Sequence, residues 1–420
     1  MKHLLFLCLF CCSFPGWAQV TAILATRLID GTGAVIENPV VIVEGERIAS
    51  VIDRDQLPTD IPVIDLGGYT LLPGLIDLHV HPNITRNDYQ IEHLSRSSAE
   101  KALLSLRRVQ GMLDAGWTTL RVAGDADVGY SNLEVRDAIN QGWFEGPTIY
   151  GAGHYISVTG GGGDINFLSY EQDVTADGWI ADGPDEIRKA IRKEIKYGSD
   201  WIKLLVTGAF MSANDNPKNV HFSPEELEAA VAEANRRNVP IMAHAHATEG
   251  IKMAVRAGVR TIEHGSFIDE EAMDLMIEQG TYLIPTFAVG LYAGYPLREK
   301  GSLRRYMSDN RKGDLGVYQS MRLAIQKGVK FGLGTDDVGW PAEFSAIELE
   351  AYVELGMTPM QTIECATRIN AEILRKEAEI GTVEAGKFAD LIAVEGHPLE
   401  DISELRRVKF VMKKGRIIRQ

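Results

Sequence analysis

The sequence is poor in cysteine: it has four in 420 residues, and three of them fall at positions 8, 11 and 12. Without that first segment only Cys365 remains, so no intramolecular disulfide can form. Stability must then come from a hydrophobic core and from bound metal. Cys365 stands in a helical pattern, where we expect a buried structural thiol rather than a nucleophile.

Positive charge is also scarce, with 43 Lys and Arg against 58 Asp and Glu and a formal net charge of −15. This balance argues against nucleic acid or an anionic membrane as a partner. The glycine run at 160–163 is not followed by Lys and Ser or Thr, so it does not form a phosphate loop. With 45% hydrophobic and 24% charged residues, the composition is that of a globular α/β protein.

A run long enough to cross a membrane is missing from the N-terminal segment. Lys2 precedes the apolar run at 4–14, and the small residues Gly16 and Ala18 occupy positions −3 and −1 of a cleavage site. We therefore expect residues 1–18 to be a signal peptide and the mature protein to be soluble and secreted or periplasmic. The residues before the three early cysteines are not small, which disfavours lipid attachment.

Both ends of the remaining chain have sequence patterns typical of short strands separated by turns. Residues 19–72 contain several such strands, and residues 376–420 contain more but are too short to fold alone. We expect the two segments to pair into one small β-sandwich domain.

Residues 73–375 alternate between strand and helix patterns, which is typical of parallel βα units. Strand candidates begin near Leu75, Thr118, Thr148, Ile202, Ile241, Thr261, Leu283 and Phe331. Helices are expected at 98–115, 185–197, 223–237 and 343–355, and the third opens with the capping box Ser223-Pro-Glu-Glu226. Eight units in one run predict a (β/α)8 TIM barrel, with a doubly wound open sheet as the alternative.

The first barrel strand ends in His79-Val-His81. Residues two apart on a strand point to the same side, so both imidazoles can bind one cation. A lone His-x-His pair is weak evidence. Its place at the end of a barrel strand, where catalytic groups collect in this fold, strengthens it.

Four more candidate ligands fall at the ends of later strands: Lys203, His244, His264 and Asp336. Together with the two histidines they occupy the first, fourth, fifth, sixth and eighth strands. Randomly placed polar residues would seldom reach so many strand ends, so the set predicts a metal centre at the mouth of the barrel.

With these motifs the chain resembles the amidohydrolase superfamily and, within it, dipeptidases and prolidase-like enzymes that cleave N-acyl amino acids. The likeness runs nearly end to end, through the segments at 73–81, 200–203, 244–246, 262–265 and 381–390. The resemblance implies two divalent cations. His79, His81 and Asp336 would hold one, His244 and His264 the other, and N6-carboxylated Lys203 would bridge them.

Elementary chemistry supports this arrangement. An ammonium beside two dications loses its proton, which frees the amine of Lys203 to react with carbon dioxide; the alternative is a buried lysine paired with a carboxylate. Zinc suits the mixed nitrogen and oxygen ligands. Asp336 would orient the attacking hydroxide and carry its proton to the departing nitrogen.

The remaining histidines and two aspartates are not assigned as metal ligands. His246 faces the same way as His244, which suggests a substrate contact, a role around the metal ligands or a structural role. His154, which precedes the glycine run, is expected to contact the substrate, as the resemblance implies. Asp77 and Asp337 are expected to orient ligands or the strand end, and His93, His221 and His397 to face solvent.

The predicted function is hydrolysis of the amide bond of a dipeptide or N-acyl amino acid. A deaminase or imidazolone-ring hydrolase is the first alternative, although such enzymes generally use one metal and lack the bridging lysine. A lactonase, a phosphotriesterase or an aryl-amide (mycotoxin) hydrolase could share the metal chemistry. A non-catalytic binding protein would lack ligands, and none is missing. The preferred amino acids and the oligomeric state are not readable from the sequence.

Overall fold

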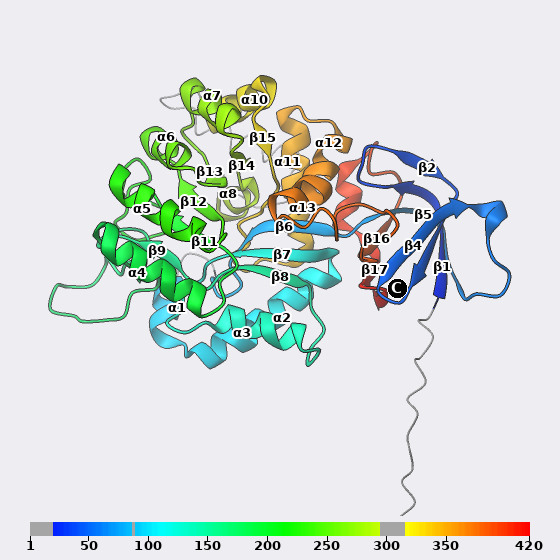
Figure 1. Cartoon of the computed structure of the whole chain (residues 1–420), viewed down its shortest axis with the longest axis horizontal. Coiled ribbons are helices and arrows are strands. Elements are labelled where there is room, and N and C mark those ends of the chain that lie inside the picture. Colours follow the sequence, from blue (N-terminus) through cyan, green and yellow to red (C-terminus); the bar gives the residue numbers. More distant parts are fainter. Residues whose placement is uncertain (1–19, 86–88, 295–315) are drawn as a thin grey trace, which may run out of the picture.

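The computed structural model describes residues 20–85, 89–294 and 316–420, and the predicted signal peptide lies outside these residues. The described chain forms a barrel surrounded by helices, with a β domain beside it at the right of Figure 1. The first and last segments of the chain, coloured blue and red, meet in that β domain.

The barrel is built from parallel strands, as the sequence predicts. In chain order they are β6 (Leu75–Val80), β7 (Trp117–Ala123), β8 (Thr148–Ala152), β9 (Tyr155–Ser157), β11 (Ile202–Leu205), β12 (Ile241–Ala245), β13 (Thr261–His264), β14 (Tyr282–Ile284) and β15 (Lys330–Phe331). Strands β8 and β9 together take the third place. The barrel closes where the segment after β15 meets β6, through the hydrogen bond from Leu78 N to Leu333 O and that from Asp336 N to His79 O. The (β/α)8 prediction is confirmed.

Helices lie around the strands. They are α1 (Tyr89–Ser95), α2 (Ser98–Asp114), α3 (Ser131–Asn140), α4 (Gly183–Lys196), α5 (Pro224–Asn235), α6 (Thr248–Ala257), α7 (Glu270–Gln279), α8 (Phe287–Gly294), α10 (Val317–Lys327), α11 (Ile347–Leu355), α12 (Pro359–Glu364) and α13 (Asn370–Ile373). The predicted capping box is present at α5, where Ser223 and Glu226 each bond the other's backbone N–H. Cys365 is buried and free, as expected.

The β domain joins both ends of the chain in one continuous sheet. Its strands are β1 (Val20–Ile29), β2 (Val35–Glu37), β3 (Pro39–Glu44), β4 (Arg47–Asp53), β5 (Val63–Pro73), β16 (Leu391–Glu395), β17 (Val408–Lys413) and β18 (Arg416–Arg419). β5 pairs parallel with β1 and antiparallel with β16, so the two ends of the chain associate as predicted. The sheet surrounds an apolar core that includes Ile23, Leu71 and Phe410.

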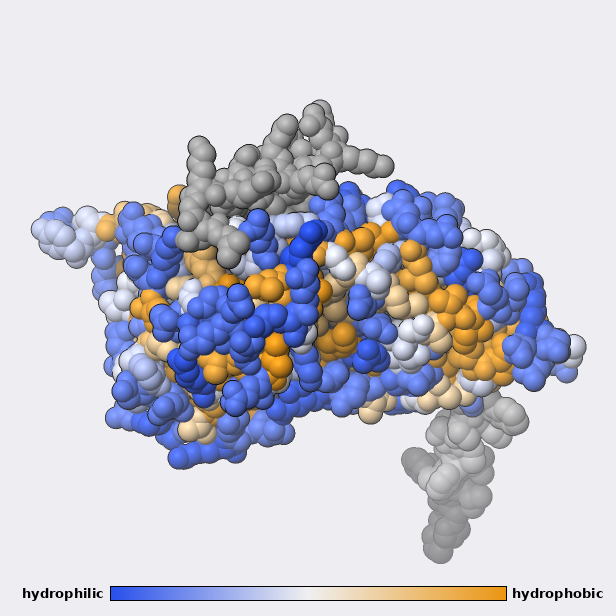
Figure 2. All heavy atoms as spheres, turned by 90° about the horizontal axis from the view of Figure 1, so that it is seen from above, coloured by the Kyte–Doolittle hydropathy of each residue, from blue (hydrophilic) through white to orange (hydrophobic). Residues whose placement is uncertain are grey.

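The surface seen from above is mostly hydrophilic, with an apolar patch over the β domain at the right (Figure 2). In the described part of the chain, no helix is both long enough and apolar enough to span a bilayer. The arrangement that matters for the site lies elsewhere, at the carboxyl ends of the barrel strands.

Candidate metal centre

The structure brings all six predicted ligands together at the carboxyl ends of the strands. His79 lies in β6, Lys203 in β11 and His244 in β12, while His264 ends β13 and Asp336 follows β15. His81 follows β6 directly. All six are buried, with at most 8% of their surface exposed.

One cluster consists of His79, His81 and Asp336, whose ligand atoms lie within 4.8 Å of one another. The two Nε2 atoms are 3.2 Å apart. Asp336 Oδ1 lies 3.6 Å from His79 Nε2 and 3.3 Å from His81 Nε2. Gly334 makes this close packing feasible, because a Cβ there would lie 2.7 Å from His79 Cβ.

The hydrogen bonds of these two histidines show which nitrogens are free. Nδ1 of His79 lies 2.6 Å from the carboxylate of Glu263, and Nδ1 of His81 lies 2.5 Å from the carbonyl oxygen of Gly124. Both partners accept, so each Nδ1 carries a hydrogen and each Nε2 carries a lone pair. Two lone pairs and a carboxylate that face one another repel unless a cation lies between them.

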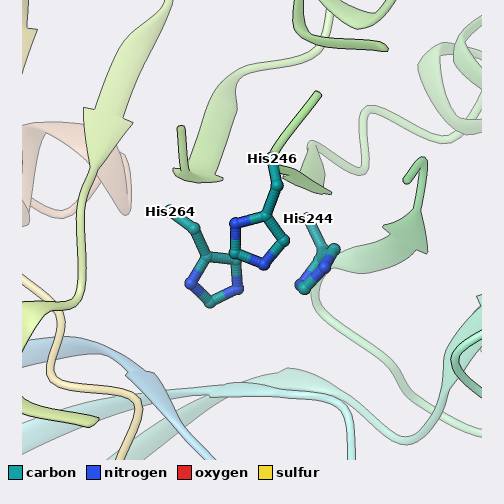
Figure 3. Close-up of side chains that lie close together, drawn as sticks. All are labelled: His244, His246 and His264. Carbon is teal, nitrogen blue, oxygen red and sulfur yellow. The ribbon is translucent and has the colours of Figure 1, made fainter. Parts of the chain in front are cut away.

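A second cluster consists of His244, His246 and His264. Figure 3 shows the three rings gathered together, and the ring centroids of His244 and His264 lie 4.4 Å apart. His244 Nε2 donates to the Gly208 carbonyl, which leaves its Nδ1 free. His264 engages the Thr286 hydroxyl through Nδ1, so its Nε2 is available to a metal. His246 engages the Ser266 hydroxyl through Nδ1, and its Nε2 can bind a metal or, in the other tautomer, donate a hydrogen bond to a bound molecule.

Burial keeps these histidines uncharged, as metal ligands must be. It lowers the pKa values of His79, His244 and His264 well below the usual value, and that of His246 to about 3. For Asp336, burial opposes ionisation, but the hydrogen bond with His81 and nearby positive charge lower its pKa to about 2. His79, His244, His246 and His264 are therefore neutral imidazoles, and Asp336 is an ionised carboxylate.

Lys203 lies beside the first cluster, and its charge also acts on His244 and His264 of the second. Its Nζ is 3.3 Å from His79 Nε2, and the His79 and His264 ring centroids are 5.0 Å apart. Burial lowers the pKa of Lys203 to about 8, so part of the side chain is an uncharged amine near neutral pH. The alternative of a lysine paired directly with a carboxylate is not what the structure shows, since no ion pair involving Lys203 is found among the described residues.

Sequence reasoning missed the pair that supports these ligands from below, Arg121 and Glu263. Both side chains are fully buried, and Arg121 Nη2 donates to Glu263 Oε1 at 2.7 Å while the other carboxylate oxygen orients His79. Such partners fix the tautomer and the direction of a metal-binding ring. The signal was present: a glutamate stands between apolar Ile262 and His264 in a buried strand.

At or shortly after three consecutive strands, β13, β14 and β15, stands a left-handed residue other than glycine. His264, Thr286 and Asp336 have φ values of 72°, 53° and 59°. Such strain collects at functional sites, where surrounding contacts hold it. Asp77 provides one of those contacts, because its carboxylate accepts hydrogen bonds from His79 N and from the backbone and hydroxyl of Thr335. Asp337 similarly accepts from Arg108, at 2.8 Å.

The centre opens into a cavity of about 560 Å³. His81, His244, His246, His264 and Asp336 line it, and most of the remaining wall is apolar, including Phe210, Phe267 and Phe287. This size and lining suit a small organic molecule with an apolar part. The predicted place of His246 beside the substrate agrees with its position in this wall.

His154 lies elsewhere, and the expected substrate contact is not what the structure shows. Its ring packs at 4.6 Å from Tyr130 and 5.7 Å from Trp179, and Nδ1 pairs with Glu194 of α4 at 2.8 Å. It does not line the cavity, whereas the next residue, Tyr155, does. His154 lies in the bend at 153–154 between β8 and β9, and this bend directs its side chain toward Glu194 of α4.

Two other histidines expected in solvent are packed inside. His93 is 6% exposed and contacts Lys101 Nζ, and His221 pairs with Asp215 at 3.2 Å. His397 is partly buried. Nε2 of His93 lies 3.2 Å from the carbonyl oxygen of Thr175, a long-range contact that local polarity does not reveal.

Comparisons with known proteins agree with this geometry. Ochratoxinase from Aspergillus niger is 33% identical over 444 residues, covering 96% of this chain and 87% of the relative. A crystal structure of a Xaa-Pro dipeptidase with bound methionine has a TM-score of 0.86 and 35% identity, and covers 96% of this chain and all of that one. Imidazolonepropionase from Klebsiella pneumoniae subsp. pneumoniae is less similar, at 23% identity, with 88% and 89% coverage.

The Amidohydrolase family profile matches residues 70–418, which include the whole barrel and every candidate ligand. The closed parallel barrel and the two neighbouring ligand clusters are consistent with this match. The chain belongs to the amidohydrolase family.

Proposed function

We propose that this enzyme hydrolyses the amide bond of a dipeptide or N-acyl amino acid at a centre of two divalent cations, with zinc as the metal. The observation that carries the proposal is the pair of neighbouring ligand clusters, with Lys203 3.3 Å from His79, at a largely apolar cavity. Ochratoxinase and the Xaa-Pro dipeptidase, which match nearly the whole chain, support an amide substrate.

The ligand roles follow from the free atoms. His79 and His81 offer Nε2 and Asp336 offers a carboxylate oxygen to one cation. His244 and His264 offer Nδ1 and Nε2 to the other. Lys203, carboxylated at Nζ, would supply one oxygen to each cation. Its buried and partly uncharged amine is the form that reacts with carbon dioxide.

Two divalent cations at such a centre, when bound, increase the acidity of water and polarise a carbonyl oxygen. Asp336 belongs to the first cluster and also lines the cavity. Its carboxylate can therefore hold the attacking water in line and accept its proton. The same carboxyl group then delivers that proton to the departing nitrogen. His246 lies in the cavity wall beside His264, where it can donate a hydrogen bond to the substrate.

The place of action is also a proposal. The leader pattern of residues 1–18 predicts export, so the enzyme would act on small amides in the periplasm or outside the cell. The acidic overall charge fits a small-molecule substrate and no nucleic acid.

The test uses residues 19–420, loaded with Zn²⁺ and screened against dipeptides and N-acyl amino acids, with metal content measured on the same sample. We expect two zinc ions per chain and release of a free amino acid. Asp336→Asn should lower kcat by about 10²–10⁴-fold, the usual contribution of a positioned acid–base group.

The same preparation distinguishes the alternatives when lactones, aryl phosphotriesters, an imidazolone and aminated bases are added to the panel. Turnover of one of these without hydrolysis of any amide would reject the proposed substrate class. One metal per chain in an active enzyme would reject the binuclear centre.

A further inference from the structure

Glu348 is a buried acidic residue that the mechanism does not use. It lies in α11 and is fully inaccessible to solvent. Its Oε2 accepts a hydrogen bond from Ala288 N at 2.6 Å, and its Oε1 has no partner among the described residues. A fully buried glutamate is rare because its desolvation is costly, so a specific contact is expected to compensate for that cost.

The contact that Glu348 makes lies at the start of α8. The first N–H groups of a helix have no partner within the helix, and a carboxyl group there satisfies them and interacts favourably with the helix dipole. Besides Ala288, the backbone of Phe287 is close enough to lower the pKa of Glu348, although burial raises it to about 8. In either protonation state, a carbonyl-type oxygen is available to accept these bonds.

The residue just before this turn touches the metal centre. Thr286 joins β14 to α8 in the left-handed conformation, which is unfavourable for a β-branched residue. Its hydroxyl lies 2.7 Å from Nδ1 of His264, so it determines the direction in which the opposite ring nitrogen points. On the other side, Phe287 forms part of the cavity wall.

We propose that Glu348 is a positioning residue for the metal centre, which acts by anchoring the first turn of α8 and so holding Thr286 against His264. The inference rests on the proposed function, because it takes His264 as a metal ligand. Among the described residues, Glu348 forms no hydrogen bond with a candidate metal ligand, and its side chain does not line the cavity. Its effect passes through Thr286, which gives the proposal a test that general stabilisation of the fold would not satisfy.

The test measures Co²⁺ binding to the metal-free protein by the visible absorption of the bound ion, which reports the ligand geometry. Loss of a group that orients a metal ligand commonly weakens binding about 10–100-fold. We expect this loss in Glu348→Met, which keeps the volume, and in Thr286→Val, which keeps the shape. Glu348→Gln keeps an accepting oxygen and should stay within about threefold of the wild type.

The double variant Glu348→Met/Thr286→Val decides whether the two residues act through the same contact. Substitutions at two residues that act through the same contact have non-additive effects on affinity. The double variant should therefore bind Co²⁺ within about twofold of the weaker single variant. Glu350→Ala is the matched control, because Glu350 is on the same helix but faces Arg406 instead of α8. It should leave Co²⁺ affinity and spectrum unchanged.

Wild-type affinity in either single variant would overturn the proposal, and so would losses that multiply in the double variant. If Glu348→Met does not fold, Thr286→Val with an unchanged Co²⁺ spectrum overturns it alone. A wild-type protein that binds no Co²⁺ would instead contradict the proposed function, so the two failures are distinct.

Discussion

The carboxylate of Glu263 lies 2.6 Å from Nδ1 of His79, and its other oxygen lies 2.7 Å from the guanidinium of Arg121. All three side chains are fully buried. The next residue after Glu263 is His264, a member of the other cluster. One short strand thus orients a ring in the first cluster and supplies a ring to the second.

Glu263→Gln is predicted to weaken metal binding by about 10–100-fold, because the neutral amide must turn its NH₂ group toward either His79 or Arg121. Isothermal titration of the metal-free variant with Zn²⁺ measures this. Glu233→Gln is a suitable control, since Glu233 also pairs with a guanidinium, that of Arg192, but far from the barrel mouth on α5. Equal affinity in Glu263→Gln and wild type would show that the pair only supports the barrel.

Replacement of Lys203 tests the bridge. Lys203→Ala should lose the second metal ion, because alanine has no group that could replace the proposed bridging oxygens beside His79, and activity should fall with it. Added short carboxylic acids should restore part of the activity, since they can occupy the vacated space as an oxygen bridge. Two metals per chain and full activity in Lys203→Ala would exclude a bridging role.

The proximity of the candidate ligands could be predicted from the sequence because each of them stands at or just after the carboxyl end of a strand. His79, Lys203, His244 and Asp336 each end an apolar segment, and parallel strands bring their carboxyl ends to one rim. The number of barrel strands could be predicted from the alternation of strand and helix patterns in residues 73–375. The pairing of the two chain ends could be predicted because the strands at each end are too few to form a stable sheet alone.

The support of the site could not be predicted because it depends on distant contacts. Glu263 and His79 are 184 positions apart, and no local pattern pairs them. The place of His154 could not be predicted because a bend at 153–154 separates β8 from β9, and there Nδ1 of His154 pairs with Glu194 of α4. The burial of His93 likewise depends on how a loop returns over it.

Cys365 is predicted to be chemically inert in the folded protein. It is 3% exposed, and burial raises the pKa of its thiol to about 12, so almost no thiolate is present at neutral pH. A thiol-reactive dye added to residues 19–420 should label no cysteine in buffer and one in denaturant. Rapid labelling of the native protein would mean that this part of the barrel opens readily.

Asp177 provides a pH test that is separate from the metal centre. Its buried carboxyl group accepts a hydrogen bond from the Tyr155 hydroxyl at 2.8 Å and lies 3.4 Å from the amide nitrogen of Gln90. Burial raises its pKa from 3.8 to about 7. The folded protein therefore keeps a proton on Asp177 at pH values where the unfolded chain has lost it.

The sign of the effect follows from this shift. The stabilisation from the raised pKa is fully present below about pH 3.8 and is lost as the pH rises through about 7, at roughly 1.4 kcal/mol per pH unit between these values. Asp177→Asn cannot titrate, so its stability relative to the wild type should rise from pH 5 to pH 7 and level off above. Apparent melting temperatures of both proteins across this range measure the difference. Parallel curves would mean that Asp177 is already ionised in the folded state at pH 5, and that its polar neighbours Tyr155 and Gln90 tolerate the charge.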